Sequence, residues 1–260
     1  MRPASLHPAL ALLAVVAGML AMVAGLAAVA PRGLRAALVV GETLLALPGV
    51  LLVAVSGLPV ARTLALHPVP RRTALLASLA GATLWAASLG LMNLQFAVWS
   101  PPPEFLESFR VLHQRLRPAT VPEALLSVLA IGIMPALCEE TLFRGVVLPS
   151  LTRWRTGTAL VGSSLLFALI HVDSAGDAAV FHRVPFAFVV GLGLGALRLL
   201  TGSLLASMVA HAVLNTITFA TVFLTGAASQ AMDEPHAATG GLLLVGGGAA
   251  TAWLFRVLRR

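Results

Sequence analysis

The sequence predicts an all-α, polytopic membrane protein with about eight transmembrane helices and a polar pocket inside the helix bundle. The 260 residues are 58% hydrophobic and 10% charged, and the mean hydropathy is +0.95. Soluble proteins carry about 25% charged residues. A second observation is that ionisable side chains occur inside the apolar runs, where each costs at least a few kcal/mol. Such residues indicate a polar site within the bundle.

The apolar runs have the length that a bilayer requires, since a spanning helix needs roughly 20 residues. The predicted spans are 9–30, 36–61, 73–99, 123–149, 157–175, 184–201, 203–225 and 240–255. The first ends in Ala28-Val29-Ala30, which resembles a signal-peptidase site. Its run of about 22 apolar residues exceeds the 7–15 of a signal-peptide core, so we expect a retained helix.

The longest connection, residues 100–121, follows three consecutive prolines. Phe105, Phe109 and Leu112 recur in it at near-helical spacing among charged residues. This pattern suits a short helix at the membrane interface, and a polar linker is the alternative. The chain thus divides into an N-terminal helical part with this connection (1–122), a core (123–220), and a C-terminal helix with a basic tail (221–260).

All 17 basic residues are arginine, and together with 10 acidic residues they give a net charge of +7. The arginines separate apolar spans, so they indicate a bilayer rather than nucleic acid as the partner. With eight spans, ten arginines fall on the side of the termini and six on the opposite side. Positive charge favours the cytoplasm, so both termini are predicted to be cytoplasmic in a bacterial inner (plasma) membrane. Cys138 is the only cysteine, which excludes an intrachain disulfide.

The fourth span contains two adjacent acids and an arginine. Glu140 and Arg144 are four residues apart, so they can form a buried ion pair on one helix face. Glu139 is turned about 100° from Glu140 and is predicted to point elsewhere. The two acids therefore have separable roles.

Two further spans carry polar pairs at the same four-residue spacing: Phe167 with His171, and His211 with Asn215. Counted from the cytoplasmic helix ends at 1.5 Å per residue, Glu139 lies about 15 Å deep, His171 about 21 Å, His211 about 12 Å and Asn215 about 18 Å. Three helices thus bring polar groups to a similar depth.

These motifs together resemble the CPBP family, which comprises type II CAAX prenyl proteases and bacteriocin-related proteins and is also called the Abi family. Its motifs EExxxR, FxxxH and HxxxN occur here in order, as Glu139 to Arg144, Phe167 to His171 and His211 to Asn215. The resemblance covers about residues 123–220. It implies an intramembrane endopeptidase that acts on a membrane-associated protein or peptide.

In this interpretation the catalytic residues are Glu139, Glu140, His171, His211 and Asn215. Glu139 is the general base, His171 holds the same water, and His211 with Asn215 stabilises the oxyanion. Glu140 and Arg144 brace the site, while Phe143 and Phe167 form walls. No cofactor is expected, and the alternative is a zinc ion on Glu139, His171 and His211.

Other functions stay open on the sequence: a transporter with a buried acid–histidine proton relay, or an immunity factor with degenerate chemistry. Among the remaining polar residues, Glu42 of the second span either reaches the interface or touches the cavity, and a structural role is favoured. His113, His182 and His236 lie in or beside loops and are predicted to be solvated. Asp173 and Asp177 are candidates for the rim of the pocket.

Overall fold

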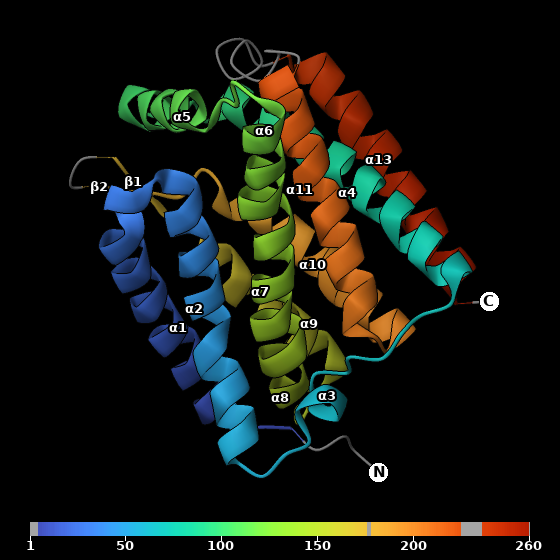
Figure 1. Cartoon of the computed structure of the whole chain (residues 1–260). Coiled ribbons are helices and arrows are strands. Elements are labelled where there is room, and N and C mark those ends of the chain that lie inside the picture. The colour runs from blue at the N-terminus through green and yellow to red at the C-terminus, as the bar shows by residue number, and fades with distance from the viewer. Residues whose placement is uncertain (1–4, 176–177, 225–235, 260) are drawn as a thin grey trace.

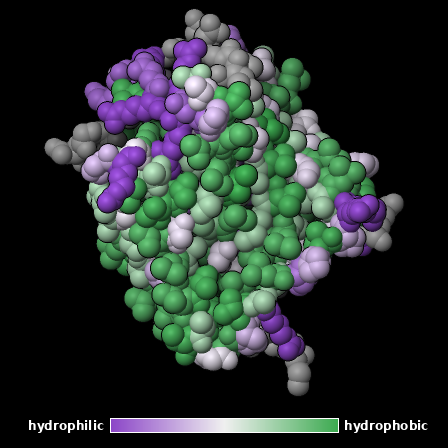
Figure 2. Space-filling model, in the orientation of Figure 1, coloured by the Kyte–Doolittle hydropathy of each residue, from purple (hydrophilic) through white to green (hydrophobic). Residues whose placement is uncertain are grey.

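The computed structural model describes residues 5–175, 178–224 and 236–259. Its helices form a bundle (Figure 1), which confirms the predicted all-α membrane fold. Seven helical segments within the described ranges are long and apolar enough to cross a membrane. On the face shown in Figure 2, apolar side chains cover most of the surface, and the largest group of polar side chains lies at one end of the bundle. Leucines and valines with more than half their surface exposed, such as Leu20 and Leu242, lie where lipid chains would surround a membrane protein.

The first half of the chain supplies outer helices on two opposite sides of the bundle and a helix across its end. Helix α1 (Pro8–Val29) packs antiparallel to α2 (Leu34–Val55), and the short α3 (Val60–Thr63) leads to α4 (Arg71–Val98). Helix α5 (Pro103–Leu116) then lies across the end of the bundle opposite the start of α1. The connection 100–121 is therefore a helix rather than a plain linker.

The central span is a continuous helical run with two π-helical segments. It consists of α6 (Val121–Ser127), η2 (Val128–Ile133), α7 (Met134–Glu140), η3 (Thr141–Val147) and α8 (Leu148–Leu151), and both η segments are π-helical. Such wide turns occur frequently at functional sites. The two glutamates close α7, and Arg144 lies in the second π segment.

The fifth predicted span, 157–175, is shorter than expected. Helix α9 (Thr156–Leu169) has 14 residues and therefore rises about 21 Å, less than the roughly 30 Å of a hydrocarbon core. The chain then forms an antiparallel hairpin of β1 (Asp173–Ala175) and β2 (Ala178–Val180). Helix and hairpin together carry the chain to the end where α5 lies (Figure 1).

The last helices complete the bundle. Helix α10 (Val184–Thr201) and α11 (Leu204–Leu224) are joined by a turn at Gly202, whose positive φ of 69° suits glycine. Helix α13 (Ala237–Leu258) packs along α4. The start of α1 and the end of α13 both lie away from α5 (Figure 1).

Candidate functional site

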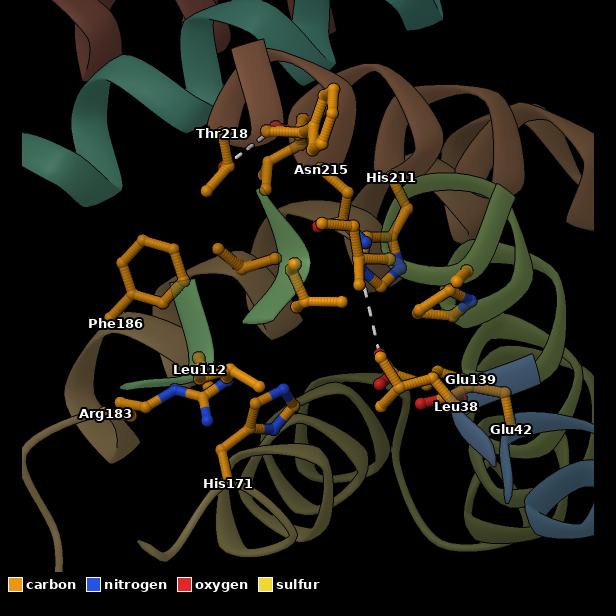
Figure 3. Close-up of a pocket in the computed structure, with 18 of the residues that line it drawn as sticks. Leu38, Glu42, Leu112, Glu139, His171, Arg183, Phe186, His211, Asn215 and Thr218 are labelled. Atoms are coloured by element: carbon orange, nitrogen blue, oxygen red, sulfur yellow. Dashed lines mark hydrogen bonds and ion pairs between the residues drawn. The ribbon is translucent and has the colours of Figure 1, made fainter. Parts of the chain in front are cut away.

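A cavity of about 310 Å³ lies among α2, α5, the central span, α10, α11 and the C-terminal end of α9. Five of the predicted site residues line it: Glu139, Phe167, His171, His211 and Asn215. Figure 3 shows the side chains of Glu139, His171, His211 and Asn215 around this cavity. Glu140, Arg144 and Phe143 are fully buried behind this lining. The structure thus brings the three motifs together at one site.

Glu140 and Arg144 form the ion pair that their spacing predicts. Arg144 Nη1 donates to Glu140 Oε1 at 2.8 Å, and Arg144 Nη2 donates to the carbonyl oxygen of Gly191 at 3.1 Å. The guanidinium carbon lies 4.3 Å from the centre of the Phe167 ring, and Phe143 meets that ring edge-on at 5.4 Å. Arg144 therefore ties the central span to α10 and α9.

His211 lies between the two glutamates. Its Nδ1 is 3.0 Å from Glu140 Oε1, and its Nε2 is 3.7 Å from Glu139 Oε2. Glu140 pairs with Arg144 and so acts as an acceptor, which assigns the proton of this contact to Nδ1. The two acids do diverge from the backbone, but both reach one imidazole. Their roles are more closely connected than the sequence suggested.

His171 is oriented by its own helix. Its Nδ1 lies 2.8 Å from the carbonyl oxygen of Phe167, and a carbonyl only accepts, so Nδ1 carries the proton. The unprotonated Nε2 of the neutral ring can then accept a hydrogen bond from a water in the cavity. Phe167 also packs against this ring, with 4.9 Å between centres.

Two charged residues of the lining were not assigned to the site from the sequence. Glu42 on α2 lines the cavity, which was one of the positions left open for it, although a structural role was favoured. Arg183, which precedes α10, also lines it and donates to Asp173 Oδ1 at 3.1 Å. Asp173 therefore holds a cation of the pocket rim, and Asp177 lies outside the described residues. An ionisable residue inside an apolar span was the available signal for Glu42.

Two of the three histidines predicted to be solvated are not. His182 is buried, with its ring 4.0 Å from that of Trp99 and its Nε2 3.2 Å from the carbonyl oxygen of Ser100. His113 on α5 is half-buried and lines the cavity, and this burial lowers its pKa. Both predictions failed because α5 folds back over the bundle. His236 is exposed as predicted.

The residues proposed for the zinc alternative do not form a metal-binding arrangement. Among the described residues, no three His, Cys, Asp or Glu side chains are placed to hold one ion together. Glu139 and His211 approach each other, but His171 does not complete a ligand set with them.

Comparison with known proteins adds one match. Residues 121–217 match the family model of type II CAAX prenyl endopeptidase Rce1-like proteins. The searches of curated proteins and of solved structures gave no match. The matched segment runs from α6 into α11 and includes all three motifs at the cavity. The match supports the resemblance of this segment to CAAX protease-like membrane proteins of the CPBP family.

Proposed function

We propose that this protein is an intramembrane endopeptidase that uses Glu139, without a metal ion, to hydrolyse a peptide bond of a membrane-associated protein or peptide. One observation carries the proposal: the three motifs of the family meet at one cavity inside an apolar bundle, and they supply polar groups to its lining. The match to type II CAAX prenyl endopeptidases supports peptide hydrolysis in general.

The reaction begins with a water molecule between Glu139 and His171. The Glu139 carboxylate removes a proton from this water while the oxygen of the water attacks the carbonyl carbon of the scissile bond. The electron pair of the C=O bond moves onto the carbonyl oxygen. The oxyanion then returns its electron pair to the C=O bond, the C–N bond breaks, and the leaving amide nitrogen takes the proton from Glu139. A positioned general base of this kind contributes about 10²–10⁴-fold to the rate.

The developing oxyanion needs hydrogen-bond donors on the α11 side of the cavity. Asn215 lines the cavity one helical turn after His211, and its amide is a donor. His211 serves as a donor through Nε2 when its ring is protonated, because Nδ1 is committed to Glu140. Donors placed in this way contribute about 3–4 kcal/mol each.

Glu140 and Arg144 act by orientation. Glu140 fixes the ring of His211 through Nδ1, and Arg144 fixes Glu140. A carboxylate that holds a histidine in one tautomer is a recurring device of hydrolytic sites.

The proposal is tested by comparing protein termini in membranes and medium of the native host with wild-type protein and with Glu139→Ala at equal abundance. We expect a small set of termini to disappear in Glu139→Ala and in His171→Ala. Cys138→Ala is the matched control, because Cys138 precedes Glu139 and does not line the cavity. Identical termini in wild type and folded Glu139→Ala would overturn the proposal and favour a proton relay or an immunity function.

Metal independence has its own test. Purified protein treated with a zinc chelator should retain its activity, and mass spectrometry should find far less than one zinc ion per active chain. A stoichiometric zinc content that falls together with activity, and a return of both on adding zinc, would contradict this part of the proposal.

A further inference from the structure

Glu42 is a carboxyl group of the cavity that the mechanism above leaves without a role. It belongs to α2, outside the segment 121–217 that matches the family. It lines the same cavity as Glu139, and Figure 3 shows both carboxyl groups at one wall. Glu42 is therefore a cavity residue that the N-terminal part of the chain contributes in addition to the family motifs.

The carboxyl group of Glu42 is incompletely satisfied. Its Oε2 is buried and has no hydrogen-bond partner within the described part of the chain. Glu140 also has a buried Oε2 without a partner, but its Oε1 is held by Arg144 and His211 and its side chain lies behind the lining, whereas Glu42 lines the cavity itself. A buried polar atom without a partner costs about 1–3 kcal/mol, whereas leucine would fill this position without that cost. The free oxygen therefore points to a partner that enters the cavity.

The packing of α2 directs Glu42 toward this cavity. Gly49 lies against the central span, where an added Cβ would come within 3.1 Å of Leu142 and 3.4 Å of Val146. Glu42 precedes Gly49 by seven residues, which is about two turns, so both lie on one face of the helix. Leu38, one turn earlier, also lines the cavity. The face that fixes α2 on the catalytic span is thus the face that presents the acid.

A peptide that enters this cavity brings unsatisfied backbone groups with it. Inside a bilayer no bulk water is available, so each N–H and C=O needs a partner in the protein. In the proposed reaction Glu139, His171, His211 and Asn215 serve the water and the scissile carbonyl only. The neighbouring peptide groups therefore still require a polar contact.

We infer that Glu42 is a substrate-positioning residue whose free carboxyl oxygen hydrogen-bonds the peptide backbone beside the scissile bond. As a carboxylate it accepts from an N–H, and as a carboxylic acid it donates to a C=O. The inference rests on the proposed function, since it assumes that a peptide occupies the cavity. It extends the active site to α2.

The test compares Glu42→Leu, Glu42→Gln and Thr43→Leu. The probe is a fluorogenic peptide that copies the sequence around a terminus lost in Glu139→Ala. Glutamine keeps both hydrogen-bonding capacities and leucine keeps neither. Thr43 is the matched control, because it follows Glu42 on α2 and is exposed on the outside of the bundle.

Glu42→Leu should raise KM about tenfold, the value of one good hydrogen bond, and leave kcat within about threefold. Glu42→Gln should stay within about threefold of wild type in both constants, and Thr43→Leu should match wild type. Thermal unfolding in detergent accompanies the kinetics. Leucine removes an unsatisfied group, so its midpoint should be equal or higher.

Three results would overturn the inference: an unchanged KM in Glu42→Leu, a loss confined to kcat, or a loss in Glu42→Gln as large as that in Glu42→Leu. If Glu42→Leu proves unstable, Glu42→Met supplies the same comparison with a more flexible side chain. Unchanged peptide cleavage by Glu139→Ala would instead overturn the proposed function itself. An inactive Glu139→Ala beside a normal Glu42→Leu would overturn only the role of Glu42.

Discussion

At the scale of single residues, the site depends on charges that are buried together. Glu140 and Arg144 are 0% and 1% exposed in their side chains, and His211 connects them to Glu139. Removing one member of a buried pair leaves the other uncompensated, which costs more than replacing both. The pair therefore has separate effects on stability and on activity, and variants can distinguish them.

Arg144→Met should lower the free energy of unfolding by about 3–5 kcal/mol, because Glu140 then lies buried with His211 alone. The double variant Glu140→Gln/Arg144→Met should recover much of this stability without recovering activity, since His211 loses its carboxylate. Thermal unfolding in detergent measures the first effect and peptide cleavage the second. If Arg144→Met is as stable as wild type, the assigned pairing of Glu140 with Arg144 is contradicted.

Asn215→Ala should lower kcat about 10²–10³-fold and leave KM nearly unchanged, because an oxyanion donor acts mainly in the transition state. Steady-state cleavage of the peptide probe measures both constants. Ile217→Val is a mild change on the same helix and serves as the control. A rise in KM at constant kcat would assign Asn215 to ground-state binding instead.

At the scale of elements, the position of α11 decides where His211 lies. Gly81 on α4 faces the backbone carbonyl of Ala210, the residue before His211, with no room for a Cβ. The central span supplies the opposite wall through α7 and its two π segments. Close helix contacts at small residues are typical of membrane bundles.

Gly81→Ala should separate α4 from α11, shift His211, and lower both activity and the free energy of unfolding, the latter by about 1–3 kcal/mol. Gly246→Ala on α13 is the matched control, because an added Cβ there meets nothing within 4 Å. That variant should be as stable as wild type or slightly more so, since alanine favours a helix. Equal activity and equal unfolding free energy in the two variants would contradict the close contact between Gly81 and Ala210.

Arg35 of α2 holds the C-terminal end of α5 by hydrogen bonds. Arg35 donates to Ser127 Oγ at 2.7 Å and to the carbonyl oxygen of Leu116 at 3.0 Å. Arg35→Ala should therefore loosen α5, and limited proteolysis should cleave faster between residues 117 and 120. Arg32→Ala, an exposed arginine of the same turn, is the control. Equal cleavage rates in both variants would show that Arg35 does not hold this end of α5.

At the scale of the whole molecule, the bundle has two chemically different ends. The ends of α2 and α8 lie near the start of α1, whereas α5 and the hairpin lie at the opposite end (Figure 1). The polar surface concentrated near α5 is visible in Figure 2. The arginine bias predicts that the first end is cytoplasmic.

Cysteine labelling in a Cys138→Ala background tests this orientation. Ser108→Cys lies on α5, and Ser56→Cys follows α2 at the other end; both positions are exposed. A membrane-impermeant maleimide added to intact cells should label Ser108→Cys and leave Ser56→Cys unlabelled until the cells are opened. The reverse pattern would invert the predicted topology.

The sequence alone determined the membrane fold, the family motifs and the Glu140–Arg144 pair. These follow from local properties: the length of apolar runs, the spacing of residues within one helix, and the high cost of burying charge. Such properties do not depend on how distant segments pack. They can therefore be predicted from the sequence without a structure.

Only the tertiary structure decided which groups meet. It placed His211 against both glutamates, brought Glu42 and Arg183 to the cavity, and covered that cavity with α5. It also replaced the fifth predicted span by a short helix and a hairpin. These contacts join residues from different elements, up to about 170 positions apart along the chain, and helix packing rather than local spacing sets their distances.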